Sequence, residues 1–202
     1  MKDTSHPNLR RAVQQDARDL AKLIDIAGEG IPSWLWGQNT AEGQSPLTVG
    51  IARARRTSGG FSYTNAVVSE EAGQVLGMAL TYPIDAAPDT DIADLPDPIK
   101  PFVELEALST GTWFVNALAT YPSSRNRRIG TVLLARVEEQ ARRAGYSEIS
   151  IQVYGQNTGA LRLYQRLGFE PVAQAPVRHH PCPPYYTGDV ILLIRKIAQR
   201  SG

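Results

Sequence analysis

The sequence predicts an α/β domain, a β-sheet with helices packed on its faces, and two observations carry this prediction. Apolar residues recur with a helical period over 129–144 and 157–167, and a glycine follows each stretch, at Gly145 and Gly168. Strand-like apolar runs over 113–120, 148–153 and 190–196 alternate with these helices. A strand-helix-strand-helix-strand order indicates a sheet that helices cover.

The N-terminal half predicts two further helices and three strands. A short strand is expected over 8–13, and a helix over 17–27 begins at Asp16 as its N-cap and ends at Gly28 as its C′ residue. The segment GEGIPSWLWG that follows is expected to be a loop, before a second helix from Ser45-Pro46 to about Arg56. Strands over 65–69 and 74–82 are joined by a tight turn.

Residues 83–111 differ in composition from the rest of the chain. They are rich in proline and acidic residues, with Lys100 as their one basic residue, so we expect an insertion with at most short helical turns. The chain is therefore predicted to be a single domain over 1–202 that carries this acidic insertion. The acids either attract a cationic substrate or form a solvated loop.

Composition excludes several classes of function. The net charge is +1, so no global field would recruit nucleic acid or an anionic membrane. Cys182 is the one cysteine, which excludes a disulfide framework within the chain. The N-terminal MKDTSHPNLRR has no apolar stretch typical of a secretory signal, and no apolar run is long enough to span a bilayer. We therefore expect a cytoplasmic protein without membrane or nucleic-acid partners.

A cluster of arginines precedes the helix that is expected from Ile129. Arg125, Arg127 and Arg128 stand where the helix N-terminus already carries partial positive charge and unpaired N–H groups. An anion would make this arrangement favourable, and a phosphate group suits both backbone N–H groups and guanidinium groups. Gly130 has no Cβ, so a ligand can approach the backbone closely. The alternative is a solvated basic turn.

The run RNRRIGT (residues 125–131) resembles the coenzyme A pyrophosphate loop of the GNAT acetyltransferase superfamily, written Arg/Gln-x-x-Gly-x-Gly/Ala. Arg125 matches the first position and Gly130 the last, whereas Arg128 stands where the first glycine is expected. We expect a side chain there to need a negative φ and to leave less room for the pyrophosphate. Either the Arg128 guanidinium then adds a phosphate contact, or coenzyme binding is weaker.

The segment NTGALRLYQRLGFEPV (residues 157–172) resembles the second coenzyme segment of the same family, Asn-x-x-Ala-x-x-Leu-Tyr-x-x-x-Gly-Phe. Each position of that pattern is present, at Asn157, Ala160, Leu163, Tyr164, Gly168 and Phe169. Asn157 suits a helix N-cap, and the spacing places Tyr164 and Phe169 in contact around the C-terminal glycine. The Tyr164 ring would then be held with its hydroxyl free to reach a ligand, although a core tyrosine is the alternative.

The resemblance implies a fold, an activity and a set of site residues. The fold is a mixed, mostly antiparallel sheet with helices on both faces. The activity is transfer of an acetyl group from acetyl-CoA to a primary amine of a small molecule or peptide, by direct attack on the thioester and without a metal. Family members are often dimers, so a homodimer is expected. The implied coenzyme-binding residues are Leu118, Ala119, Thr120, Arg125, Asn126, Arg127, Arg128, Ile129, Gly130, Thr131, Asn157, Ala160 and Tyr164.

The proposed chemistry needs an acid and a base. Tyr164 is expected to be the general acid that protonates the leaving thiolate, while N–H groups of residues 118–120 polarise the carbonyl. The strand TWFVNALAT offers no carboxylate that could take the amine proton. We favour Glu106 as the base, with Glu104 and Glu29 as the other candidates, although each could be a solvated carboxylate.

The acceptor site is less clearly marked. Glu29 and Glu104 are candidate acceptor-binding residues, and Trp34 and Trp36 are expected to line an apolar acceptor pocket unless they are buried structural indoles. The segment RHHPCPPYY is expected to be a proline-stiffened connection and not a metal site. Two other functions stay open: a catalytically silent acyl-CoA sensor or regulatory module, and a protein N-terminal acetyltransferase.

Overall fold

The computed structural model describes residues 8–38, 40–87 and 89–198. The segment 1–7, part of the N-terminal stretch that we interpreted as lacking a secretory signal, lies outside these residues. The chain forms two compact units. The first contains the residues up to Leu80 together with Ala117–Ala135, and the second contains Thr81–Asn116 and the residues from Arg136 onward.

The first unit begins with an antiparallel meander. Its strands are β1 (Asn8–Arg11), β2 (Ala66–Glu71) and β3 (Gln74–Ile84), with β2 between the other two. Arg10 lies opposite Val68, and Val68 lies opposite Met78. The turn from β2 to β3 is Ala72-Gly73, with φ of 49° and 77°. Positive φ at both central residues matches the right-handed twist of the hairpin strands.

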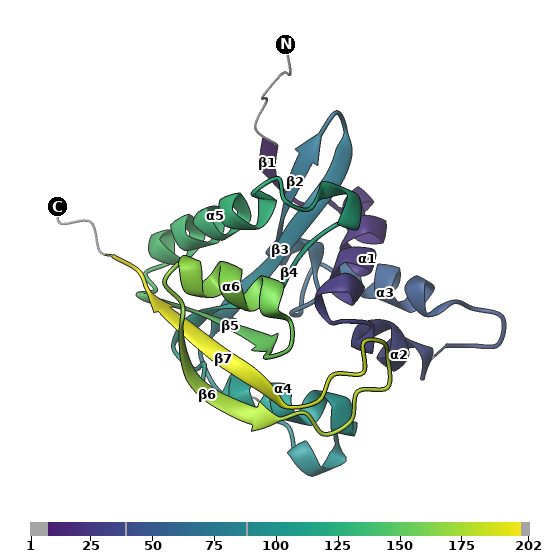
Figure 1. Cartoon of the computed structure of the whole chain (residues 1–202). Helices are drawn as coiled ribbons and strands as arrows, with labels where there is room; N and C mark the ends of the chain where they lie inside the picture. The colour runs from purple at the N-terminus through teal and green to yellow at the C-terminus, as the bar shows by residue number, and fades with distance from the viewer. Residues whose placement is uncertain (1–7, 39, 88, 199–202) are drawn as a thin grey trace. The chain divides into compact units, whose positions relative to one another are not determined.

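Three helices of the first unit lie beside one another in Figure 1: α1 (Ala17–Ala27), α2 (Ile31–Gly37) and α3 (Pro46–Ala54). The 3-10 turns η1 (Gln14–Asp16) and η2 (Tyr63–Asn65) precede α1 and β2. The core of the unit joins Leu20, Leu23 and Ile24 of α1 to Val68 and Met78 of the sheet. The apolar period that predicts α1 therefore identifies its buried face.

Two predictions for this unit are wrong. The segment GEGIPSWLWG is not a loop throughout, because Ile31–Gly37 forms α2 with a proline in its first turn. Gly28 ends α1 as predicted, but it is the C-cap residue and not the C′ residue, and its φ is −87°. A Cβ at Gly28 would lie 2.5 Å from Cδ of Pro32. This glycine is thus needed for close packing between the end of α1 and the start of α2.

The second unit contains the other strands, β5 (Glu148–Tyr154), β6 (Glu170–Pro176) and β7 (Asp189–Lys196), and the first part of β4 (Thr112–Thr120). β4 pairs with β5 in parallel, Trp113 opposite Ile149, while β7 pairs with β5 and β6 in antiparallel orientation. The seven-stranded sheet has the order β1-β2-β3-β4-β5-β7-β6. The predicted mixed, mostly antiparallel α/β fold is confirmed.

Strand β6 is missing from the sequence prediction. Its sequence, EPVAQAP, contains two prolines and few β-branched residues, so it carries little strand propensity. It stands last in the strand order, where proline is tolerated because only one side of the strand needs ladder hydrogen bonds. The expected connection RHHPCPPYY joins β6 to β7.

The acidic insertion is more ordered than predicted. It contains the 3-10 turns η3 (Ile92–Asp94) and η4 (Asp97–Ile99) and an α-helix, α4 (Lys100–Ala107), whereas we expected only short turns; residue 88 lies outside the described part. Leu105 of α4 is 2% exposed and belongs to a core cluster with residues of β5, β6 and β7. This burial stabilises a helix that local propensity alone does not indicate.

The two helices with the clearest periodicity are found close to their predicted bounds, as α5 (Ile129–Arg143) and α6 (Thr158–Arg166). Gly145 and Gly168 follow them with φ of 87° and 82°, as the prediction of C-terminal glycines requires. Between β4 and α5 stands a last 3-10 turn, η5 (Pro122–Ser124), followed by the arginine-rich loop.

Candidate functional site

The arginine-rich loop of the first unit has an unusual backbone. Asn126 and Arg128 both lie in the left-handed region, with φ of 62° and 60°. The expectation that Arg128 takes a negative φ is therefore wrong. A left-handed conformation costs a residue with a side chain about 1–2 kcal/mol. Strain of this kind often accompanies a functional constraint.

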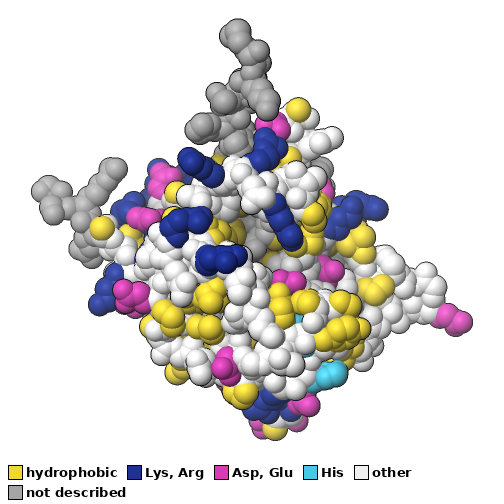
Figure 2. All heavy atoms as spheres, viewed as in Figure 1, with side chains coloured by type: hydrophobic (Ala, Val, Ile, Leu, Met, Phe, Trp, Pro, Cys, Tyr) yellow, Lys and Arg dark blue, Asp and Glu magenta, His cyan; other side chains and the backbone are white. Residues whose placement is uncertain are grey.

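The loop offers hydrogen-bond donors to solvent. Residues 125–128 are exposed, and within the described part of the chain no acceptor is found for the N–H groups of Asn126, Arg127 and Arg128. These groups directly precede α5, whose own N-terminus favours an anion. Lys and Arg side chains gather on the face in Figure 2 where Figure 1 draws the start of α5. The arrangement suits a phosphate group.

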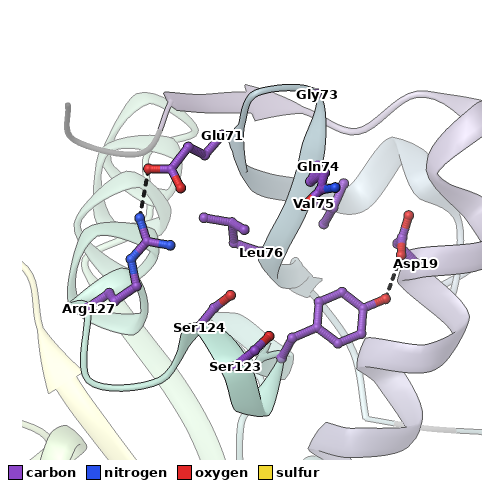
Figure 3. Close-up of a pocket in the computed structure, with 10 residues that line it drawn as sticks. Asp19, Glu71, Gly73, Gln74, Val75, Leu76, Ser123, Ser124 and Arg127 are labelled. Carbon is purple, nitrogen blue, oxygen red and sulfur yellow. Dashed lines mark hydrogen bonds and ion pairs between the residues drawn. The ribbon is translucent and has the colours of Figure 1, made fainter. Parts of the chain in front are cut away.

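The three arginines of the loop are not equivalent. Nη2 of Arg127 lies 2.7 Å from Oε1 of Glu71, at the end of β2, as Figure 3 shows. Among the described residues, no carboxylate pairs with Arg125 or Arg128. The structure therefore leaves the guanidinium groups of Arg125 and Arg128 available to an anion and assigns a protein partner to that of Arg127.

Arg127 and Glu71 border a polar pocket of about 530 Å³ within the first unit (Figure 3). On the other side of this pocket, the phenol of Tyr121 donates a hydrogen bond of 2.5 Å to Oδ1 of Asp19 on α1. The remaining lining residues are Gly73, Gln74, Val75, Leu76, Ser123 and Ser124. Sequence reasoning missed Asp19 and Glu71, because both meet the loop only through long-range contacts.

The end of β4 carries the residues expected to contact the pantetheine arm and the thioester. Ala119 is 7% exposed, and Leu118 and Thr120 are half-buried. A Cβ added at Gly77 of β3 would lie 2.7 Å from the Ala119 carbonyl oxygen and 2.8 Å from Cγ2 of Thr120. Gly77 thus permits a close approach of β3 to this part of β4.

In the second unit, Tyr164 is held as the sequence predicts. Gly168 and Phe169 donate backbone hydrogen bonds to the carbonyls of Gln165 and Tyr164, both at 3.0 Å, which forms a Schellman motif. The Tyr164 and Phe169 rings lie 6.0 Å apart between centroids. Tyr164 is only 5% exposed, and burial raises the pKa of its phenol. Its proton is therefore retained throughout the neutral range.

The N-terminus of α6 also agrees with the sequence. Oδ1 of Asn157 accepts a hydrogen bond of 3.2 Å from the N–H of Ala160, so Asn157 is the N-cap. This bond holds the Asn157 side chain beside the first turn of α6.

Glu104 and Glu106 of α4 lie in different surroundings. The Glu104 carboxylate pairs with the guanidinium of Arg178, whereas Glu106 has no cationic partner among the described residues. Burial raises the pKa of Glu106. Sequence reasoning missed Tyr82, which lies near Glu106, and Asn116, which lies near Tyr82. Burial first and the Glu106 charge second raise the pKa of Tyr82, while a hydrogen bond from Asn116 lowers it.

Most of the other acids in the insertion have local partners. Asp85 accepts a 2.5 Å hydrogen bond from the Tyr146 phenol, and Asp91 accepts the Ala93 N–H at 2.9 Å. Asp97 pairs with Lys100 at 2.8 Å. Glu106 is a half-buried carboxylate without a cationic partner among the described residues, and burial raises its pKa.

The candidate acceptor residues of the first unit differ in exposure. Trp36 is 2% exposed, and its ring would lie 2.4 Å from a Cβ at Gly50, so its indole is part of the core. Trp34 is half-buried, and Glu29 follows α1 with a φ of 51°. Trp36 is therefore a buried structural indole and does not line an acceptor pocket.

Neither a metal centre nor a membrane segment is found in the described part of the chain. Among those residues, no three His, Cys, Asp or Glu side chains gather closely enough to hold a metal ion. Over the same ranges, no helix combines the length and the apolar composition that crossing a membrane requires.

Comparison with known proteins identifies the class. The model of the acetyltransferase (GNAT) family matches residues 30–169, so the chain belongs to the GNAT acetyltransferase family. No curated protein matches the sequence significantly. Many solved structures share the fold. An N-acetyltransferase from Staphylococcus aureus Mu50 has a TM-score of 0.67 and 21% identity, covering 93% of this chain and 99% of its own.

Two other similar structures carry information on ligands of those proteins. A mutant agmatine N-acetyltransferase in its apo form has a TM-score of 0.65 and 16% identity over 95% of this chain and 100% of its own. A protein from Salmonella typhimurium, solved with its cofactor acetyl-CoA, has a TM-score of 0.60 and 21% identity over 98% of both chains. At these identities the likeness concerns the fold.

Proposed function

We propose that this chain is an N-acetyltransferase that transfers an acetyl group from acetyl-CoA to a primary amine of a small molecule or peptide. The observation that carries the proposal is the loop before α5, with its N–H groups without acceptors and with Arg125 and Arg128 free of carboxylates in the described part of the chain. Membership of the GNAT family supports it. The coenzyme supplies an activated acetyl thioester.

The proposed coenzyme contacts extend those of the loop. Arg125, Arg128 and the N–H groups of residues 126–131 bind the pyrophosphate, because donors at a helix N-terminus and guanidinium groups suit phosphate oxygens. Residues 118–120 bind the pantetheine arm and polarise the thioester carbonyl. Asn157 and Ala160 are further proposed contacts. Arg127 acts through Glu71 and not as a direct phosphate ligand.

Tyr164 is the proposed general acid. A group that donates a proton to the departing sulfur must be protonated at neutral pH, and the raised pKa of Tyr164 meets this condition. Because thiols have a pKa of roughly 8.5, full transfer from a weaker acid to the thiolate is uphill. Tyr164 therefore stabilises the developing negative charge on sulfur chiefly by donating a hydrogen bond.

Glu106 is the proposed base. Its raised pKa makes the carboxylate a better proton acceptor than an ordinary glutamate, and no cation among the described residues neutralises its charge. The amine proton passes to this carboxylate, directly or through water, before the neutral nitrogen attacks the carbonyl carbon. Glu29, Trp34 and Glu104 are proposed to border the acceptor.

The experiment that tests the function has two arms. Calorimetry measures association of the chain with coenzyme A, and a thiol assay measures its release from acetyl-CoA with a panel of amines. Turnover with any amine supports the enzyme. Binding without turnover favours the catalytically silent sensor, and no binding at millimolar coenzyme A overturns both.

The panel also separates the acceptor classes. It contains agmatine, other small amines and peptides with a free α-amino group. Small molecules and peptides present the acceptor amine in different chemical surroundings, so the panel can tell them apart. A preference for peptides indicates a protein N-terminal acetyltransferase. The predicted homodimer is tested by light scattering after size-exclusion chromatography, and the cytoplasmic location by cell fractionation.

A further inference from the structure

The segment between β4 and α5 is fastened at both ends by carboxylates that belong to other elements of the first unit. Tyr121, its first residue, donates a hydrogen bond from its phenol to the carboxylate of Asp19 on α1. Arg127, close to its end, is paired with Glu71 of β2. Figure 3 draws both contacts at opposite sides of the same pocket. We call the two contacts together the carboxylate clamp.

The Asp19 contact fixes where the segment begins. Besides the 2.5 Å bond from its phenol, Tyr121 donates its backbone N–H to the Leu76 carbonyl of β3 at 2.9 Å. Burial first, and the hydrogen bond to Asp19 second, raise the pKa of the Tyr121 phenol. The phenol therefore keeps its proton at neutral pH, and the hydrogen bond persists.

The Glu71 contact fixes the strained part of the loop. Arg127 lies between Asn126 and Arg128, the two residues in the left-handed conformation. The backbone around Arg127 makes few hydrogen bonds of its own among the described residues, so it is not held by regular structure. An unsupported loop would leave this conformation readily, since each left-handed residue costs free energy.

We propose that Asp19 and Glu71 are positioning residues for the coenzyme loop, and that the carboxylate clamp holds its N–H groups in the arrangement that receives an anion. This inference rests on the proposed function. Binding to a preformed loop avoids the entropy cost of ordering it, and this is how positioning increases affinity.

The direction in which coenzyme binding changes when the Glu71 charge is removed tests the proposal. If Arg127 were itself a phosphate ligand, Glu71 would compete for its guanidinium and repel the anion. Removing the Glu71 charge would then tighten coenzyme binding. If Glu71 positions the loop, removing its charge weakens binding, although a negative charge near an anion site has been lost.

The experiment compares Glu71→Gln, Tyr121→Phe and Arg127→Gln with a matched control, Glu42→Gln. Glu42 is exposed and belongs to the same unit, so this control removes the same charge without touching the clamp. Calorimetry with coenzyme A should show that each clamp variant raises Kd by about threefold to fivefold, a range set by the modest strength of exposed ion pairs. Glu42→Gln should leave Kd unchanged.

Two further readouts separate positioning from general destabilisation. In the clamp variants the KM for acetyl-CoA should rise while kcat and the KM for the amine stay constant. Glu71→Gln and Arg127→Gln together should cost no more than either alone, because both remove the same contact. A tighter Kd in Glu71→Gln, or additive losses in the double variant, would overturn the proposal.

Hydrogen exchange without coenzyme tests the clamp independently of the proposed function. In the clamp variants the amides of Ser124, Arg125 and Val132, which donate to carbonyls within the segment, should exchange at least about threefold faster. Unchanged exchange would overturn the clamp. If the clamp variants exchange faster but the chain binds no coenzyme A, the carboxylate clamp is supported and the proposed function is wrong. Failure of the clamp can thus be distinguished from failure of the proposed function.

Discussion

The loop before α5 and the helix α4 show two different ways in which a sequence encodes a chemical site. The loop brings its arginines and N–H groups together within a few consecutive residues, so the anion site that we propose there is a local feature of the sequence. Glu106 of α4 is ordinary in sequence, and its raised pKa results from burial in the folded chain. Local sites can be read from a sequence, and sites defined by burial require the fold.

The largest effect should come from Tyr164, which combines a local motif with burial. Tyr164→Phe should lower kcat by about a hundredfold, within the usual range for acid–base catalysis, and leave the KM for acetyl-CoA nearly unchanged. Steady-state kinetics at pH 7 measure this. Tyr185→Phe, at a tyrosine that is 63% exposed, is the control and should retain full activity. An unchanged kcat in Tyr164→Phe would eliminate the acid role.

Glu106→Gln tests whether Glu106 acts as the base. The base acts only when ionised, so activity of the native protein should fall as the pH drops through the raised pKa of Glu106. The variant should lose about fiftyfold in kcat/KM and lack this acidic limb. Asp94→Asn, which removes an exposed carboxylate of the same insertion, should keep both the rate and the limb.

The same substitution should affect stability in the opposite direction. A raised carboxyl pKa in the folded state means that the contribution of Glu106 to stability is largest at low pH and declines as the pH rises from the unfolded pKa through the folded one. Removing the half-buried charge should therefore raise Tm at pH 7 by about 2 °C and flatten its dependence on pH above 4.5. Loss of both activity and Tm would indicate a structural role for Glu106.

Substitutions at Arg128 separate the contribution of its side chain to coenzyme binding from the strain of its backbone. Arg128→Gly and Arg128→Ala both remove the guanidinium, but only glycine adopts the left-handed φ of 60° without strain. The glycine variant should be more stable than the alanine variant by about 1 kcal/mol in urea unfolding. Both should weaken coenzyme A binding by about threefold and lessen its salt dependence. Equal stabilities would show that residue 128 is not strained.

The smallest effect is expected at Arg178. Arg178→Gln releases the Glu104 carboxylate from its ion pair and adds one uncompensated negative charge to the acidic insertion. The kcat/KM for a cationic amine should rise by about twofold and should depend more steeply on salt, because exposed charges act weakly and are screened. An unchanged kcat/KM with an unchanged salt response would favour the solvated-loop interpretation of the insertion.

The sequence predicted the features that neighbouring residues determine and missed those that depend on distant parts of the chain. The Tyr164–Phe169 contact was predictable because a glycine at C′ fixes the geometry of neighbouring residues. The left-handed φ of Arg128 was not, since side-chain sterics argue against it and only the surrounding turn imposes it. Strand β6 was missed because its prolines conceal a strand that depends on β7 for its hydrogen bonds.

The site residues divide in this way too. The Asn157 cap could be predicted because it lies directly before the helix that it caps. The arginine cluster proposed to bind the pyrophosphate is likewise contiguous in the sequence. Asp19 and Glu71 could not, since Asp19 is 102 residues from Tyr121 and Glu71 is 56 residues from Arg127. The same holds for Tyr82 near Glu106 and for Asn116, its hydrogen-bond partner, which carry no local pattern.

Strand β6 limits how two copies of this chain could assemble. It stands at the end of the strand order, its register shifts between Pro171 and Ala173, and its two prolines lack N–H donors. An interrupted edge of this kind is a poor template for adding another strand. If copies meet along β6, they must therefore do so through side chains such as Val172, 54% exposed, and not by extending the sheet from one subunit into the next.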